Sequence, residues 1–161
     1  MTNSNERHRL SLIIATLGPS TDNEKELITM LMAGIARQWT DGVDIARVLH
    51  SDGEDIARNR IDIFRSQSKK RNLSTQIYLD TDSENIDIEK YINFANTVGP
   101  DIATFPKSIG IENFSKIKDN LNSEIKISLR LKNSDSLDDL ESYYDHCAYV
   151  MIESSSQDIV D

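Results

Sequence analysis

The feature that most constrains the fold is a short apolar run near the start of the chain, Leu12–Leu17, which stops at Gly18-Pro19. Thr21 follows, with Glu24 three residues later, and this pair predicts a helix N-terminus capped by Thr21. An apolar run that is closed by a turn and followed by a helix indicates a buried strand of a parallel sheet. Such sheets carry their functional groups at the carboxyl ends of the strands, so we look for a site there.

The same strand–helix unit repeats along the chain. Further apolar runs predict strands over 43–49, 75–80, 101–105, 125–131 and 149–152. Helical spacing of apolar residues predicts helices over 22–33 and 54–70, and others marked by Ile88, Tyr91, Ile92 and Ala95, by Ile111, Phe114, Ile117 and Leu121, and by Leu137, Leu140 and Tyr144. Strands that alternate with helices predict an α/β fold with a parallel sheet of about six strands.

Periodicity leaves two architectures open, an open doubly wound sheet and an incomplete TIM-barrel-like sheet. A complete eight-stranded barrel usually needs about 250 residues, and this chain has 161. We expect a flexible N-terminal tail over 1–9 and one α/β domain over 10–161, with a connecting insertion over 35–42. No apolar run reaches the length of a membrane span, and the polar start does not resemble a signal peptide.

Charge and cysteine content limit the partners and the compartment. The net charge is −9, and both nucleic acid and anionic membranes are bound through positive faces, so we expect neither as a partner. The single cysteine, Cys147, cannot form an intramolecular disulfide, which fits a reducing, cytoplasmic setting.

In the predicted helix over 54–70, Ile56, Ile63 and Phe64 are expected to face inward. The basic residues on and just after it are expected to form a solvated face: Arg58, Arg60, Arg65, Lys69, Lys70 and Arg71.

Several motifs at the predicted strand ends, taken in order, resemble the barrel domain of the pyruvate kinase family. They are Ala15-Thr16-Leu17-Gly18-Pro19-Ser20, Ala46-Arg47-Val48-Leu49-His50-Ser51-Asp52-Gly53, Leu79-Asp80-Thr81, Thr104-Phe105-Pro106-Lys107-Ser108 and the run Ile125–Asn133. The resemblance extends from about Leu12 to Ile152 and favours the incomplete TIM barrel over the open sheet. It also implies departures from the family, because the inserted lid domain, the last two barrel strands and a further C-terminal domain have no counterpart here.

The resemblance implies that the catalytic positions have changed. The family's phosphoryl-transfer lysine falls on Arg130, its metal-binding glutamate on Lys132 and its second acidic metal ligand near Ser155. Phosphoryl transfer from an enol phosphate needs cations held by carboxylates and a positioned acid. Lys132 opposes a divalent cation, and a guanidinium does not give up its proton. We therefore predict no catalytic residue and no cofactor, with Mg²⁺ and K⁺ required only if the family's activity is retained.

What the resemblance leaves is a basic rim. It implies a site for a small phosphate or carboxylate built from Arg47, Arg130, Lys132 and Lys107. It also implies a remnant of the family's potassium site at Ser51, Asp80 and Thr81. The alternative is that the basic residues pair with Asp52, Asp80 and Asp82 in a polar network without a ligand. The acidic run 80–84 is otherwise read as a solvated turn, because it lacks the glycine and distal glutamate of a calcium loop.

Three functional hypotheses follow. The first is a non-catalytic pyruvate-kinase-like protein, a pseudoenzyme that acts through a partner or a small anion. The second is an enzyme that retains pyruvate-kinase-type phosphoryl transfer or acts on phosphoenolpyruvate or other keto-acid substrates, and the third is a decayed fragment. Six strands of a barrel leave two open edges, so we expect a homo-oligomer or another protein to cover them.

Overall fold

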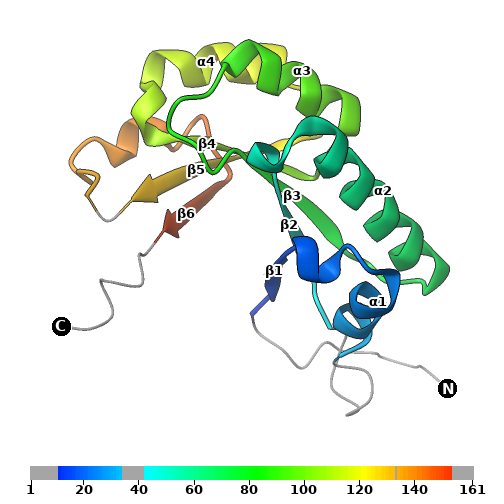
Figure 1. Ribbon diagram of the computed structural model, residues 1–161. Helices are drawn as coiled ribbons and strands as arrows, with labels where there is room; N and C mark the ends of the chain where they lie inside the picture. Colours follow the sequence, from blue (N-terminus) through cyan, green and yellow to red (C-terminus); the bar gives the residue numbers. More distant parts are fainter. Residues whose placement is uncertain (1–10, 34–41, 133, 154–161) are drawn as a thin grey trace, which may run out of the picture.

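The computed structural model of the protein describes residues 11–33, 42–132 and 134–153 (Figure 1). The predicted tail over 1–9, most of the predicted insertion over 35–42, and Ser155 lie outside the described residues. The described part of the chain alternates strands with helices from Ile14 to Glu153, which confirms the predicted α/β class.

Across the part of the chain that the structure describes, the sheet has six parallel strands, in the same order in space as in the sequence. Their bounds are β1 Ile14–Thr16, β2 Ile45–Leu49, β3 Gln76–Asp80, β4 Ile102–Pro106, β5 Lys126–Lys132 and β6 Tyr149–Glu153. A doubly wound sheet reverses its strand order at a switch point, and this sheet has no reversal. The sheet instead curls into a half-barrel, with β1 and β6 as its two edges, so the prediction of an incomplete TIM-barrel-like fold is confirmed (Figure 1).

In the described ranges, four α-helices follow four of the strands and cover the convex side of the sheet (Figure 1). They are α1 Glu24–Met32, α2 Glu54–Lys70, α3 Ile88–Val98 and α4 Ile111–Asn120. Short 3-10 turns lie at η1 Pro19–Thr21, η3 His50–Asp52, η4 Lys107–Ile109 and η5 Leu140–Tyr143. The helix predicted from Ile88 ends as expected at Gly99, whose φ of 57° is the left-handed conformation that glycine adopts without strain.

The two faces of the sheet differ in chemistry because side chains alternate along each strand. The residues that face the helices are apolar and form the core with them: Ala46, Val48, Ile77, Leu79, Ala103, Phe105, Ile127, Leu129 and Leu131. The residues that face the concave side include a small apolar cluster of Ile45, Tyr78 and Ile102, with Met151 against it. Nearer the carboxyl ends of the strands this concave face becomes polar, and the candidate site is built there.

The first strand was predicted to be buried, and this is wrong. Leu12 and Ile14 are 55% and 53% exposed, because β1 is the edge of the sheet and pairs only with β2 in the described part of the chain. The predicted cap also differs. Asn23, not Thr21, caps α1 by accepting a hydrogen bond from the Lys25 amide at 2.8 Å, while Thr21 closes the preceding 3-10 turn through Gly18.

The helix predicted from Leu137, Leu140 and Tyr144 is also wrong, because the segment forms only the turn η5. Leu137 and Tyr144 are exposed, and of the predicted apolar stripe only Leu140 packs against the core. The Ser136 hydroxyl donates to the Asp138 carboxylate and accepts from the Asp138 amide, and such local bonds compete with a regular helix.

Helix α2 contains two further corrections and one confirmation. Phe64 is buried as predicted, but Ile56 is exposed. Arg60 is not on a solvated face, because it is buried and forms two ion pairs. Its Nε and Nη2 donate to the two carboxylate oxygens of Asp22 at 2.6 and 3.0 Å, and Nη1 donates to Asp52. These contacts lower the pKa of Asp22, chiefly through the hydrogen bond from Arg60, and tie the turns after β1 and β2 to α2.

We predict that Arg60→Met destabilises the fold by about 2–3 kcal/mol, because two carboxylates lose the donor that satisfies them. Chemical denaturation of the purified variant measures the change. The matched control is Lys69→Met on the same helix, which is exposed and should change stability by less than about 0.5 kcal/mol. Equal effects of the two substitutions would contradict the structural role of Arg60.

Candidate functional site

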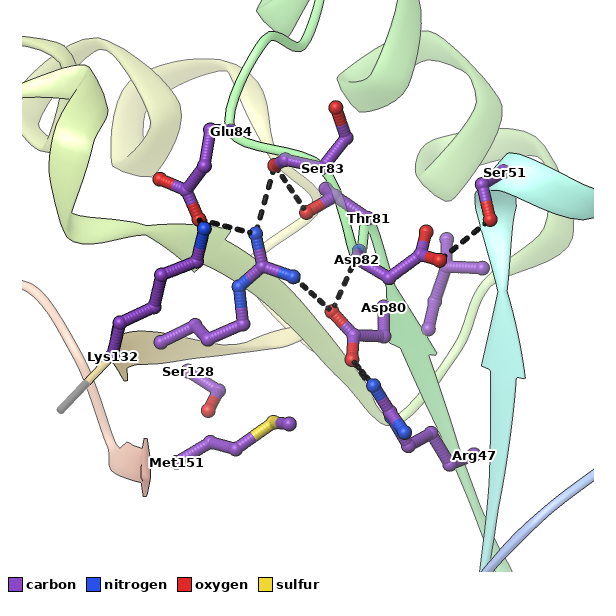
Figure 2. Close-up of polar contacts among 12 residues, drawn as sticks. Arg47, Ser51, Asp80, Thr81, Asp82, Ser83, Glu84, Ser128, Lys132 and Met151 are labelled. Atoms are coloured by element: carbon purple, nitrogen blue, oxygen red, sulfur yellow. Dashed lines mark hydrogen bonds and ion pairs between the residues drawn. The ribbon is translucent and has the colours of Figure 1, made fainter. Parts of the chain in front are cut away.

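The candidate site lies at the mouth of the half-barrel, where β2, β3 and β5 end (Figure 2). Parallel strands present their carboxyl ends at one side of a sheet, so residues distant in the sequence meet there. Arg47 comes from β2, Asp80 from the end of β3, and Arg130 and Lys132 from β5. Three of the four predicted anion-binding residues, Arg47, Arg130 and Lys132, are therefore in one network.

Asp80 is the buried centre of this network and is 0% exposed. One of its oxygens accepts a hydrogen bond from Arg47 Nε at 2.7 Å and forms an ion pair with Arg47 Nη2 at 2.6 Å. Its other oxygen accepts from the Asp82 amide at 3.1 Å and lies 3.8 Å from Arg130 Nη1. Asp82 has a φ of 46°, so this hydrogen bond helps to hold a strained turn directly after β3.

Arg130 is 1% exposed and reaches from β5 to the loop after β3. Its Nη2 donates to the Ser83 carbonyl at 2.8 Å and to Glu84 Oε1 at 3.0 Å. Glu84 also pairs with Lys132 Nζ at 3.1 Å and accepts a hydrogen bond from Ser108. Burial by itself raises the pKa of Glu84, but the hydrogen bonds from Ser108 and Lys132 and the charge of Arg130 outweigh it and lower the pKa.

These contacts form a chain of alternating charge, in the order Arg47, Asp80, Arg130, Glu84 and Lys132. We call these five residues the mouth network. Three cations against two carboxylates leave it with one positive charge, in a protein whose net charge is −9. Each cation has a carboxylate partner, so the alternative of a polar network describes much of the arrangement, although Glu84 takes the place expected for Asp52 and Asp82.

Part of Arg130 remains without a partner. Within the described residues, its buried Nε has no hydrogen-bond partner, and its Nη1 has only the ion pair with Asp80 at 3.8 Å. The buried hydroxyl of Thr104 on β4 makes no hydrogen bond in those residues either. Beside them, the Tyr78 hydroxyl lies 3.0 Å from Ser128 Oγ and contacts Met151 Sδ at 3.1 Å. Buried donors are normally satisfied by protein, water or a ligand. Arg130 and Thr104 therefore offer polar groups to a small acceptor on the concave face.

The fourth predicted anion-binding residue lies outside the mouth network. Lys107, at the start of η4, forms an ion pair with Asp139 at 2.5 Å and donates to the Ser136 carbonyl at 2.5 Å. Those partners come from the segment after β5, so Lys107 anchors that segment to the end of β4.

The three residues of the predicted potassium site lie at the ends of β2 and β3, but their oxygens have separate partners. Ser51 donates to Asp82 at 2.7 Å, Thr81 donates to the Ser83 carbonyl at 3.3 Å, and Asp80 accepts from Arg47 (Figure 2). The described ranges contain no group of three His, Cys, Asp or Glu side chains placed to hold a metal ion. The potassium site stays a prediction.

Sequence reasoning missed Glu84 and Thr104. The run 80–84 was predicted to be a solvated turn, and this is wrong for its first two residues, since Asp80 and Thr81 are buried. Arg130 alternates with Lys126, Ser128 and Lys132 along β5, so the pattern predicts a solvated side chain rather than a buried guanidinium that requires carboxylate partners. The sequence does not say which acidic residue provides them, since Glu84 lies 46 positions away.

The fold and the mouth network define an α/β half-barrel protein with a charged mouth. No protein-family model matches the chain, and no curated protein matches it. In the parts of the chain that the structure describes, none of the helices has the length and apolar character needed to cross a membrane.

We predict that Asp80→Asn destabilises the protein by about 2–4 kcal/mol, because Arg47 and Arg130 both lose a buried negative partner. Urea denaturation measures the change. The control is Asp82→Asn, an exposed carboxylate two residues along, which should cost less than about 1 kcal/mol. If both variants were as stable as the wild type, Asp80 would not organise the mouth.

We also predict a pH-dependent effect of Glu84→Gln. The folded-state pKa of Glu84 is lowered, so its ionised form stabilises the protein above the unfolded pKa, and this contribution is lost as the pH falls through the folded pKa. Glu84→Gln should therefore be less stable than the wild type at pH 7 by about 1–3 kcal/mol, and the difference should shrink below about pH 4. Denaturation curves at pH 7, 5 and 3 test this. A constant difference at all three values would contradict it.

Proposed function

We propose that this protein is a non-catalytic, pyruvate-kinase-like protein that acts by binding a small anion or another protein. The motifs that resemble the family support the proposal by their place in the fold. Those of the first four strands run into or just past the ends of β1, β2, β3 and β4, and the fifth motif spans β5. This is the side of a parallel barrel where binding and catalytic residues gather.

The observation that carries the proposal is that Arg130 and Lys132 are both cationic and both form ion pairs with Glu84. In the resemblance they replace the family's phosphoryl-transfer lysine and a metal-binding glutamate, and both are paired with Glu84. A buried guanidinium cannot act as a proton donor near neutral pH. Lys132 puts positive charge where a divalent cation would need a carboxylate. On this proposal, neither of these two positions supplies the acid or the metal ligand that the family's reaction uses.

A coupled assay with phosphoenolpyruvate, ADP, Mg²⁺ and K⁺ tests the loss of catalysis. We expect turnover below a hundredth of a typical rate of about 10 s⁻¹, with an authentic pyruvate kinase as the positive control. Turnover above that level which disappears in Arg130→Met would support the alternative, an enzyme that retains the family's reaction or another reaction on phosphoenolpyruvate or keto acids.

Two donors of Arg130 favour a small carboxylate or phosphate as the ligand, because among the described residues Nε makes no hydrogen bond and Nη1 has only Asp80 at 3.8 Å. An anion near Nε and Nη1 would satisfy them, and the surplus positive charge of the mouth network would attract it. The hydroxyl of Thr104 would then be a further donor. The anion would approach from the concave face of the sheet, because the helices cover the other side.

Thermal unfolding with oxalate, phosphate or phosphoenolpyruvate tests this ligand class. An anion that binds the folded state should raise the melting temperature, and Thr104→Val, which keeps the volume of the side chain, should reduce the rise. Sodium chloride at equal ionic strength is the control. An identical response to chloride and to all three anions would contradict a specific site.

The proposal places the protein in the cytoplasm, since its single thiol, Cys147, is suited to a reducing compartment.

A further inference from the structure

The exposed apolar side chains of this protein gather at the two edges of its sheet. Among the residues that the structure describes, nine large apolar side chains are exposed, and six of them lie on or directly before an edge strand: Leu12, Ile13, Ile14, Tyr149, Val150 and Ile152. An edge strand with exposed apolar side chains invites pairing with another chain, and natural proteins usually protect such edges with charge or proline. The two edges, β1 and β6, differ in the number of charged residues that protect them.

The β1 edge also offers unpaired backbone. The Ile13 carbonyl accepts hydrogen bonds from Asp44 and Ile45, and the Leu17 amide donates to the Arg47 carbonyl, so the odd-numbered residues face β2. Backbone groups alternate in direction along a strand, so those of Ile14 and Thr16 point to the open side. No other strand pairs with that side in the described ranges. A further strand could therefore add there without breaking a bond to β2.

Charge distinguishes the two edges. The residues from Ser11 to Thr21 include no charged side chain, so two copies of an acidic protein can meet at β1 without like charges opposing each other. The β6 edge ends at Glu153 and follows Asp145, so two copies that met there would bring acidic residues together. Like charges placed opposite each other disfavour association.

We propose that β1 is a homodimer interface, where it pairs antiparallel with β1 of a second copy. A two-fold axis perpendicular to the strands relates two identical edges in this way, and two-fold dimers are the commonest protein assemblies. The pairing uses the outward backbone groups of Ile14 and Thr16 and buries Leu12 and Ile14 of both copies. It deepens the partner-binding part of the proposed function, but it does not depend on the loss of catalysis.

The test is the mass of the full chain in solution, measured by light scattering after gel filtration at about 50 µM. We expect twice the 18.2 kDa of one chain. Ile14→Glu should give a monomer, because it places two carboxylates in the interface. Ile14→Pro should also give a monomer, because it removes an outward amide that makes no bond to β2. The matched control is Ile152→Glu at the other edge, where the side chain is 71% exposed, and it should remain a dimer.

Three results would overturn the inference: a monomeric wild type, a dimer that survives both substitutions at Ile14, or a dimer lost only in Ile152→Glu. The last would assign the contact to β6. Circular dichroism of each variant verifies that a monomer is folded, and an unfolded Ile14→Glu leaves the decision to Ile14→Pro. The phosphoenolpyruvate assay is independent of the mass measurement. An active dimer would therefore reject the proposed loss of catalysis but not this interface. An inactive monomer would reject this interface but not the proposed loss of catalysis.

Discussion

The buried carboxylate of Asp80 is the constraint on which the mouth of the half-barrel depends. A carboxylate removed from water needs compensating charge and hydrogen bonds, and Arg47 and the Asp82 amide provide them from β2 and from the turn after β3. Arg130 shares the same carboxylate at a longer distance and in turn requires Glu84. The positions of Arg47, Arg130 and Glu84 thus follow from one buried carboxylate at the end of one strand.

This charge order bears on function because it decides which groups are available for chemistry. The carboxylates of the mouth network neutralise arginine and lysine, and a metal ion would have to compete with those cations for them. The guanidinium of Arg130 has spare donors but no proton to transfer. A site with these properties fits the proposed binding of a small anion, and its ion pairs also hold the loop after β3 in place.

The sequence predicted the parts of the fold that repeat. Apolar runs that include Val48, Leu79 and Phe105 indicate strands from the local sequence alone. That the carboxyl ends of these strands meet at one side of the sheet follows from the parallel topology. The exposure of Leu12 was not predictable, because an edge strand and a central strand can have the same apolar pattern. Arg60 and Glu84 were missed for a related reason, since their partners lie on other elements, and single-sequence patterns do not record pairing over such separations.

The sequential strand order also has a consequence for how the molecule assembles and opens. Every strand lies beside the next one in the chain, so each added strand and helix can dock on the unit made just before it. Such nearest-neighbour architecture favours stepwise growth from a central nucleus, and the terminal units are held from one side only. Amide protons should therefore exchange fastest in β1 and β6 and slowest in β3 and β4, a gradient of protection set by topology rather than by amino-acid composition.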